Sequence, residues 1–146
     1  MLAGQVVACA LMLTHFALLE AETGAAVMGV AGLQAALAIP LGTHPRFKYI
    51  YLASLLLTPL VSAVTWHRLP SVFSSLALMI VCVANFQLDQ VRQRAILIGA
   101  IFAWIAHNFL VASVPGLVSN SLALAVSTHM LFRTIKAARN AASEPA

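Results

Sequence analysis

Two histidines, His15 and His107, lie within long apolar stretches of the sequence. Ionisable side chains are rare in such stretches, so each is a candidate functional group. Imidazole can be neutral or charged near pH 7, and such a pair could bind a solute or carry a proton. The commoner role of such residues is to hydrogen-bond to a neighbouring helix and stabilise the fold. Both interpretations stay open at the level of the sequence.

Other polar or aromatic side chains accompany the histidines. On a helix, Trp104, His107 and Asn108 share one face, where an indole ring and an amide could form the wall of a site for a sugar-like or aromatic solute. An amide both donates and accepts hydrogen bonds, so it suits solute hydroxyls or a second helix. The candidate solute-binding residues are His15, Gln34, Trp104, His107, Asn108 and Asn120.

The sequence contains no pattern typical of catalysis. It has no phosphate-binding loop, no nucleophile with an adjacent base and no pair of metal ligands at helical spacing. We therefore expect no enzymatic activity, no metal site and no cofactor. A haem held between His15 and His107 is a remote alternative, because bis-imidazole ligation needs two facing histidines at matched depth.

The composition places these residues in a membrane. Of 146 residues, 62% are hydrophobic and 8% are charged, and the mean hydropathy is +0.95. About a quarter of the residues of a soluble domain are charged, and a disordered chain has a high charge and few apolar residues. This composition therefore excludes both classes. The net charge of +4 is spread among loops, so we expect no nucleic-acid partner. The two cysteines lie in apolar runs and indicate neither a disulfide framework nor a zinc site.

Apolar runs with short polar or proline-containing breaks predict an all-α, polytopic membrane bundle of about six transmembrane helices. These helices form one transmembrane domain, residues 1–139, followed by a flexible cytoplasmic tail, residues 140–146. The predicted spans cover residues 2–19, 25–41, 49–65, 71–86, 95–112 and 117–132.

The basic residues predict the orientation of this bundle. With an even number of spans, both termini lie on the same side of the membrane. That side carries every lysine and arginine except Arg68, whereas Glu20 and Glu22 lie opposite. Because basic loops stay in the cytoplasm, we expect both termini to be cytoplasmic.

The chain also contains a weak internal repeat. Aligning His15 with His107 also aligns Leu18 with Leu110, Gly24 with Gly116 and Ala31 with Ala123. Each copy reads as the end of a helix, a turn and a helix of small residues. The two copies fall on spans that run in the same direction, as in the parallel repeats of some transporters.

Two segments resemble a known family. The stretch Trp104-Ile105-Ala106-His107-Asn108-Phe109, followed by Gly116 and Arg133, resembles the C-terminal signature of the YgjV-type bacterial inner-membrane proteins. Residues 14–19 (Thr-His-Phe-Ala-Leu-Leu) are similar to that family's earlier His-Phe segment. The resemblance covers most of the chain and is specific around residues 104–133. The family is distantly similar to SWEET and PQ-loop proteins, which implies a three-helix-bundle repeat here that lacks the helix preceding Met1.

The expected function is that of an integral protein of the bacterial inner membrane, similar to a small-solute transporter, with a polar site between the membrane centre and the outer surface. The alternative is a structural or accessory membrane protein that does not transport. The expected partners are the lipid bilayer, a small-molecule solute and a second copy in a homodimer.

Overall fold

The protein is a bundle of helices. The structure is a computed structural model that describes residues 2–66, 68–87 and 89–143. Six helices are present over these residues, so the all-α expectation is confirmed. Their bounds are α1 (Leu2–Leu18), α2 (Glu22–Leu41), α3 (Tyr49–Val64), α4 (Arg68–Phe86), α5 (Gln90–Leu110) and α6 (Val114–Ser143).

Three of the helices are long and apolar enough to cross a membrane: α2, α4 and α5, with 20, 19 and 21 residues. The helices α1 and α3 are also apolar but have 17 and 16 residues, somewhat less than the roughly 20 that a perpendicular span needs. The predicted span 117–132 lies inside α6, which is longer and less apolar and does not meet the same criterion over its described residues.

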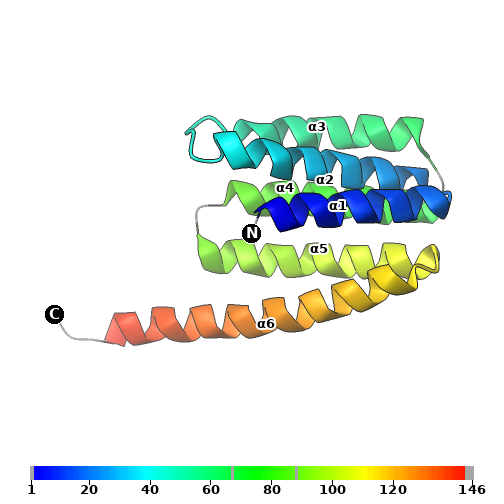
Figure 1. The fold of residues 1–146 in the computed structure, drawn as a ribbon. Helices are drawn as coiled ribbons and strands as arrows, with labels where there is room; N and C mark the ends of the chain where they lie inside the picture. The colour runs from blue at the N-terminus through cyan, green and yellow to red at the C-terminus, as the bar shows by residue number, and fades with distance from the viewer. Residues whose placement is uncertain (1, 67, 88, 144–146) are drawn as a thin grey trace.

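Consecutive helices run antiparallel, so the connections alternate between two ends of the bundle (Figure 1). One end, which we call the basic end, carries the start of α1, the end of α6, the loop 42–48 and the connection between α4 and α5. All described lysines and arginines except Arg68 lie in or next to these segments. The other end, which we call the histidine end, carries the turns after α1, α3 and α5.

The helices α2 and α4 form the centre of the bundle. α2 packs on α1, α3 and α4, and α4 also packs on α3 and α5. Val27 of α2 meets Leu78 and Cys82 of α4 in the core. Small residues allow α1 to approach α2 closely: a methyl group on Gly32 would lie 3.1 Å from Cβ of Cys9.

Large apolar side chains cover the outside of the bundle. Leu18, Leu56 and Phe109 are each more than 70% exposed, and leucines and valines from every helix are exposed with them. Such a surface suits lipid, because a soluble protein exposes only small apolar patches.

The last helix lies at the edge of the bundle. α6 packs mainly on α5, and Figure 1 shows its C-terminal part extending beyond the other helices at the basic end. The helix continues through Ser143, so residues 140–143 of the predicted flexible tail are helical. Residues 144–146 of that tail lie outside the described residues.

Candidate functional site

Two turns at the histidine end have the same backbone structure. After α1, the N–H of Ala21 donates to the carbonyl of Phe16, and after α5 the N–H of Ser113 donates to the carbonyl of Asn108, both at 2.9 Å. This pattern is the Schellman motif, in which the penultimate residue adopts the left-handed conformation. In each turn a residue other than glycine does so: Glu20 has a φ of 56° and Ala112 a φ of 52°.

These turns fall at corresponding positions of the sequence repeat. The alignment that pairs His15 with His107 also pairs Glu20 with Ala112. The left-handed conformation costs a residue with a Cβ about 1–2 kcal/mol, so its presence at both positions is informative. The two helix–turn–helix segments therefore share a backbone geometry as well as a few identical residues.

The first histidine links α1 to the turn after α5. His15 is half-buried, and its Nε2 lies 2.9 Å from Oγ of Ser113, within hydrogen-bonding distance. Ser113 is buried, and its Oγ also accepts the backbone N–H of Gly116 at 3.2 Å. This one hydroxyl thus connects the first half of the chain to the start of α6.

The second histidine links α5 to α4 and α2. Nδ1 of His107 donates to the carbonyl of Pro70 at 2.9 Å, because a carbonyl can only accept. In the neutral ring, Nε2 then carries the lone pair. That atom is buried without a hydrogen-bond partner among the described residues, and it faces Gly24 so closely that a methyl group there would lie 2.7 Å away. The side chain is 1% exposed.

Asn108 is buried in a similar way against the other glycine of the repeat. Its Nδ2 donates to the carbonyl of Trp104 at 2.8 Å. Within the part of the chain that the structure describes, its Oδ1 is buried without a hydrogen-bond partner, and a methyl group on Gly116 would overlap it. Contacts between a polar atom and a glycine Cα are weakly favourable and compensate only part of a missing hydrogen bond. Both sites therefore need glycine for the close approach.

A fully buried phenylalanine lies between these groups. The ring of Phe16 stacks on Trp104, with centroids 6.0 Å apart and an angle of 5° between the planes. It also meets His107 edge-on at 5.0 Å and lies 5.8 Å from His15. We call the residues of this assembly the histidine cluster: His15, Phe16, Trp104, His107, Asn108 and Ser113.

Hydroxyl groups also link the helices at this end of the bundle. Oγ1 of Thr23 donates to the backbone carbonyl of Thr65 and lies 2.9 Å from Oγ of Ser71. These contacts join α2 to the end of α3 and the start of α4. Sequence reasoning missed them, and it also missed Phe16 and Ser113. Their position in the sequence could have indicated them, since each hydroxyl residue lies within a few residues of a turn between helices.

Four of the six predicted site residues come together, and two do not. His15, Trp104, His107 and Asn108 belong to the histidine cluster. Gln34 lies in the middle of α2, where its Nε2 approaches Sγ of Cys82 at 3.5 Å. Asn120 lies on α6 and donates to the carbonyl of Gly116 in its own helix at 3.0 Å. Among the described residues, neither amide forms a hydrogen bond with the histidine cluster.

The arrangement does not fit a haem. Bis-histidine ligation needs two imidazoles facing each other across the porphyrin. Here the ring of Phe16, 0% exposed, contacts both imidazoles, and His107 directs Nδ1 at Pro70 and Nε2 at Gly24. Over the described residues, no group of three or more His, Cys, Asp and Glu side chains could hold a metal ion.

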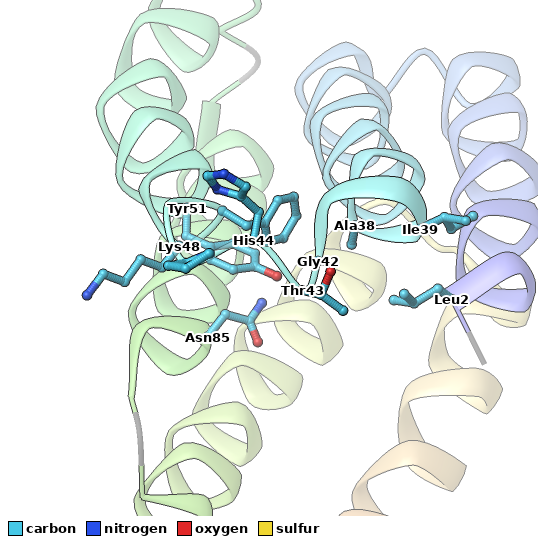
Figure 2. A pocket seen from close by; sticks show the side chains of 11 residues that line it. Leu2, Ala38, Ile39, Gly42, Thr43, His44, Lys48, Tyr51 and Asn85 are labelled. Atoms are coloured by element: carbon cyan, nitrogen blue, oxygen red, sulfur yellow. The ribbon is translucent and has the colours of Figure 1, made fainter.

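The basic end is hollowed. A cavity of about 660 Å³ opens there (Figure 2). It is lined by Leu2 at the start of α1, by the end of α2, by the loop 42–48, by the start of α3, and by Asn85 near the end of α4. We call it the basic-end hollow. Its volume lies within the range of about 300–1,000 Å³ typical of small-molecule sites.

Apolar spans, a lipid-compatible surface and a buried polar cluster define a multi-pass helical membrane protein. The chain belongs to the Imp-YgjV family, bacterial inner membrane proteins, whose family model matches residues 1–138. The resemblance of residues 104–133 lies within this match, so the family expected from the sequence is confirmed. The protein is thus a multi-pass protein of the bacterial inner membrane. No curated protein and no protein of solved structure matches the chain significantly.

Proposed function

We propose that the protein transports a small solute, and that this structure is closed at the histidine end and open at the basic end. The observation that carries the proposal is the contrast between the two ends. Phe16, His107 and Asn108 are buried almost completely at one end, whereas a cavity of about 660 Å³ opens at the other. A cavity of about 400 Å³ at the histidine end is lined by α3, Trp66 and α4 and by no residue of the histidine cluster, so it does not open the cluster. A transporter that works by alternating access is closed at one end and open at the other in its inward-facing and outward-facing states.

The contacts at the closed end lie between the two copies of the repeat. His15 belongs to the first copy and contacts Ser113, which is in the turn of the second. His107 belongs to the second copy and lies against Gly24, which is in the first. Transporters built from repeats change state largely by rocking one unit against the other. A three-helix-bundle arrangement of the SWEET type is part of this proposal.

The distribution of charge supplies a direction. Basic segments remain in the cytoplasm, so we place both termini and the basic-end hollow on the cytoplasmic side and the histidine cluster towards the periplasm. In this arrangement the predicted polar site acts as the outer closure, and the solute enters or leaves through the hollow. The proposal involves no covalent chemistry, and the protein is not an enzyme.

A second candidate function is a structural one without transport. It is favoured by the packing of the histidine cluster, in which one ring nitrogen of His15 and one of His107 already bind a partner in another segment of the protein. Hydrogen bonds of this kind between membrane helices contribute about 0.6 kcal/mol each on average, which suffices to hold helices together.

Thiol labelling distinguishes the two functions without knowledge of the solute. The background is the full chain with Cys9 and Cys82, both buried, replaced by alanine. A membrane-impermeant maleimide is added from the periplasmic side to Ser113→Cys, and from the cytoplasmic side to Asn85→Cys. If the closed end opens periodically, Ser113→Cys reacts slowly but completely, and Asn85→Cys reacts readily from its own side.

The matched control is Glu22→Cys, at an exposed position next to the same end. It is expected to react at once with the periplasmic reagent. If Ser113→Cys stays unlabelled in folded protein while Glu22→Cys reacts, the histidine end does not open, and the structural function replaces the transport function. Flux of sugars, amino acids and bases into proteoliposomes then identifies the solute.

A further inference from the structure

The basic-end hollow is lined by hydrogen-bond donors. Thr43 and His44 come from the loop after α2, Lys48 and Tyr51 from the region where α3 begins, and Asn85 from α4. No carboxylate is among the described residues that line it. A solute that fills this hollow therefore meets hydroxyl, imidazole, amide and ammonium groups, which all can donate to an anionic oxygen.

Two of these donors are already oriented by their neighbours. Nδ1 of His44 accepts the backbone N–H of Arg46 at 3.2 Å, so the neutral ring carries its proton on Nε2. Oδ1 of Asn85 accepts a hydrogen bond from Nε2 of Gln93 at 3.3 Å, so the oxygen of this amide already has a partner within the protein. Figure 2 shows the nitrogen of Asn85 on the side of the amide that faces the loop. Its N–H groups are thus directed to the hollow.

The lysine can move towards the hollow. Its stem lines the cavity, while its Nζ lies over the rings of Tyr49 and Phe86, 5.7 and 5.8 Å from their centroids. Figure 2 shows the ammonium group directed away from Asn85. Exposed cation–π contacts are weak, and lysine has a flexible stem, so rotation towards an anion requires little energy.

The surrounding charge favours an anion as well. The basic end carries all described lysines and arginines except Arg68. The described carboxylate at this end, Asp89, is paired with Arg92 at 3.5 Å. Basic clusters next to low-dielectric walls raise the local concentration of anions. Leu2 and Ile39 supply an apolar wall across the hollow from Lys48, and the edge-paired rings of Phe47 and Tyr51 add apolar surface beside the donors.

We propose that the basic-end hollow binds a small organic anion, in which a carboxylate or phosphate is attached to an apolar body. The anionic oxygens contact Lys48, Asn85 and the hydroxyl of Tyr51, and the apolar body lies against Leu2 and Ile39. The inference names the substrate class of the proposed transporter and to that extent rests on the proposed function. Binding itself requires no transport.

The test is thermal unfolding of the purified full chain with matched pairs of probes. Benzoate and hexanoate are compared with benzamide and hexanamide, which have the same shape without the charge. The carboxylates are expected to raise the unfolding temperature in a saturable manner, and the amides to have little effect. Equal shifts from acid and amide would overturn the proposal.

Matched variants locate the site. Lys48→Gln is expected to weaken binding of the carboxylates about ten-fold, the loss of one charge-assisted hydrogen bond. Lys136→Gln removes the same charge from α6, which does not line the hollow, and is expected to retain the affinity of the original protein. An equal loss in both variants would mean a general effect of net charge and would overturn the site. Tyr51→Phe, which keeps the ring, is expected to weaken binding about two- to ten-fold.

Lipid nanodiscs identify the source of the anion. If carboxylates bind in phosphatidylcholine but are displaced in phosphatidylglycerol, the hollow holds the phosphate of an anionic lipid. If they bind in both, it holds a soluble solute. Because these are equilibrium measurements, they can succeed even if Ser113→Cys labelling shows that the histidine end never opens.

Discussion

Gly24 of α2 is the position where a single methyl group tests the packing of the histidine cluster. In Gly24→Ala, the new Cβ lies 2.7 Å from Nε2 of His107, 3.0 Å from Cε1 and 3.4 Å from a carbon of Phe16. A comfortable contact between such atoms is about 3.5 Å, so the ring and the helix must separate by about 0.8 Å.

The imidazole has little room for such a shift. On its other side Nδ1 is held 2.9 Å from the carbonyl of Pro70, and the rings of Phe16 and Trp104 meet it at 5.0 and 5.4 Å. Overpacking in a close-packed interior costs about 1–3 kcal/mol, and a lost hydrogen bond adds about 1 kcal/mol. Replacing glycine by alanine in a helix returns about 1 kcal/mol. The net expectation is a decrease of about 1–3 kcal/mol in the free energy of unfolding.

The assay is unfolding by sodium dodecyl sulfate in mixed micelles, followed by circular dichroism. The control is Gly99→Ala in α5, where a methyl group meets nothing within 4 Å. There only the helix propensity acts, and the stability is expected to rise by up to about 1 kcal/mol. If Gly24→Ala proves as stable as Gly99→Ala, the imidazole is not packed on the glycine and the reasoning about the closed end is wrong.

A double-mutant cycle isolates the contact. In a His107→Ala background the obstructing ring is absent, so Gly24→Ala is expected to cost little or to stabilise. The coupling between the two substitutions should then exceed about 1 kcal/mol, within the range for residues in direct contact. A coupling near zero would assign the effect of Gly24→Ala to some other cause.

Three further substitutions test the same end of the bundle by the same unfolding assay. Gly116→Ala places a methyl group against the side-chain amide of Asn108 and is expected to lower the free energy of unfolding by about 1–3 kcal/mol. An unchanged stability would contradict the packing. Ser113→Ala removes the hydroxyl that connects α1 to the start of α6 and should cost about 1 kcal/mol, whereas exposed Ser119→Ala should cost almost nothing. Ala112→Gly relieves the left-handed conformation and should stabilise by about 0.5–1 kcal/mol, while Ala95→Gly, in the exposed first part of α5, should destabilise by a similar amount. Shifts of the same sign in this last pair would refute the account of the turn.

The histidine cluster and the basic-end hollow together change the role that we assign to the two histidines. From the sequence, His15 and His107 are candidates for direct contact with a solute. In the structure, His15 contacts a serine and His107 a carbonyl and a glycine, all of the protein itself. Their contribution to the proposed transport is therefore to close one end, and the donors around Asn85 at the other end are the groups that a solute can reach.

The sequence determined the class of the protein and the position of its helices. A mean hydropathy of +0.95 with 8% charged residues is compatible only with a lipid environment, and polar breaks of a few residues mark the ends of the helices. The repeat could also be recognised in the sequence. Because the capping of a helix depends on local sequence, the turns at Glu20 and Ala112 have similar backbone conformations. The family also followed from residues that lie close together in the chain.

Only the tertiary structure decided which side chains meet. Helical periodicity places Trp104, His107 and Asn108 on one face, but it does not say which helix that face packs against. The structure brings Phe16 of α1 and Gly24 of α2 to this face and places His15 on Ser113. It leaves Gln34 on Cys82 and Asn120 on its own helix. In a chain that is apolar all round, the pattern of hydrophobicity hardly distinguishes one helix face from another. Close packing of small residues makes that choice, and it depends on contacts between residues far apart in the sequence.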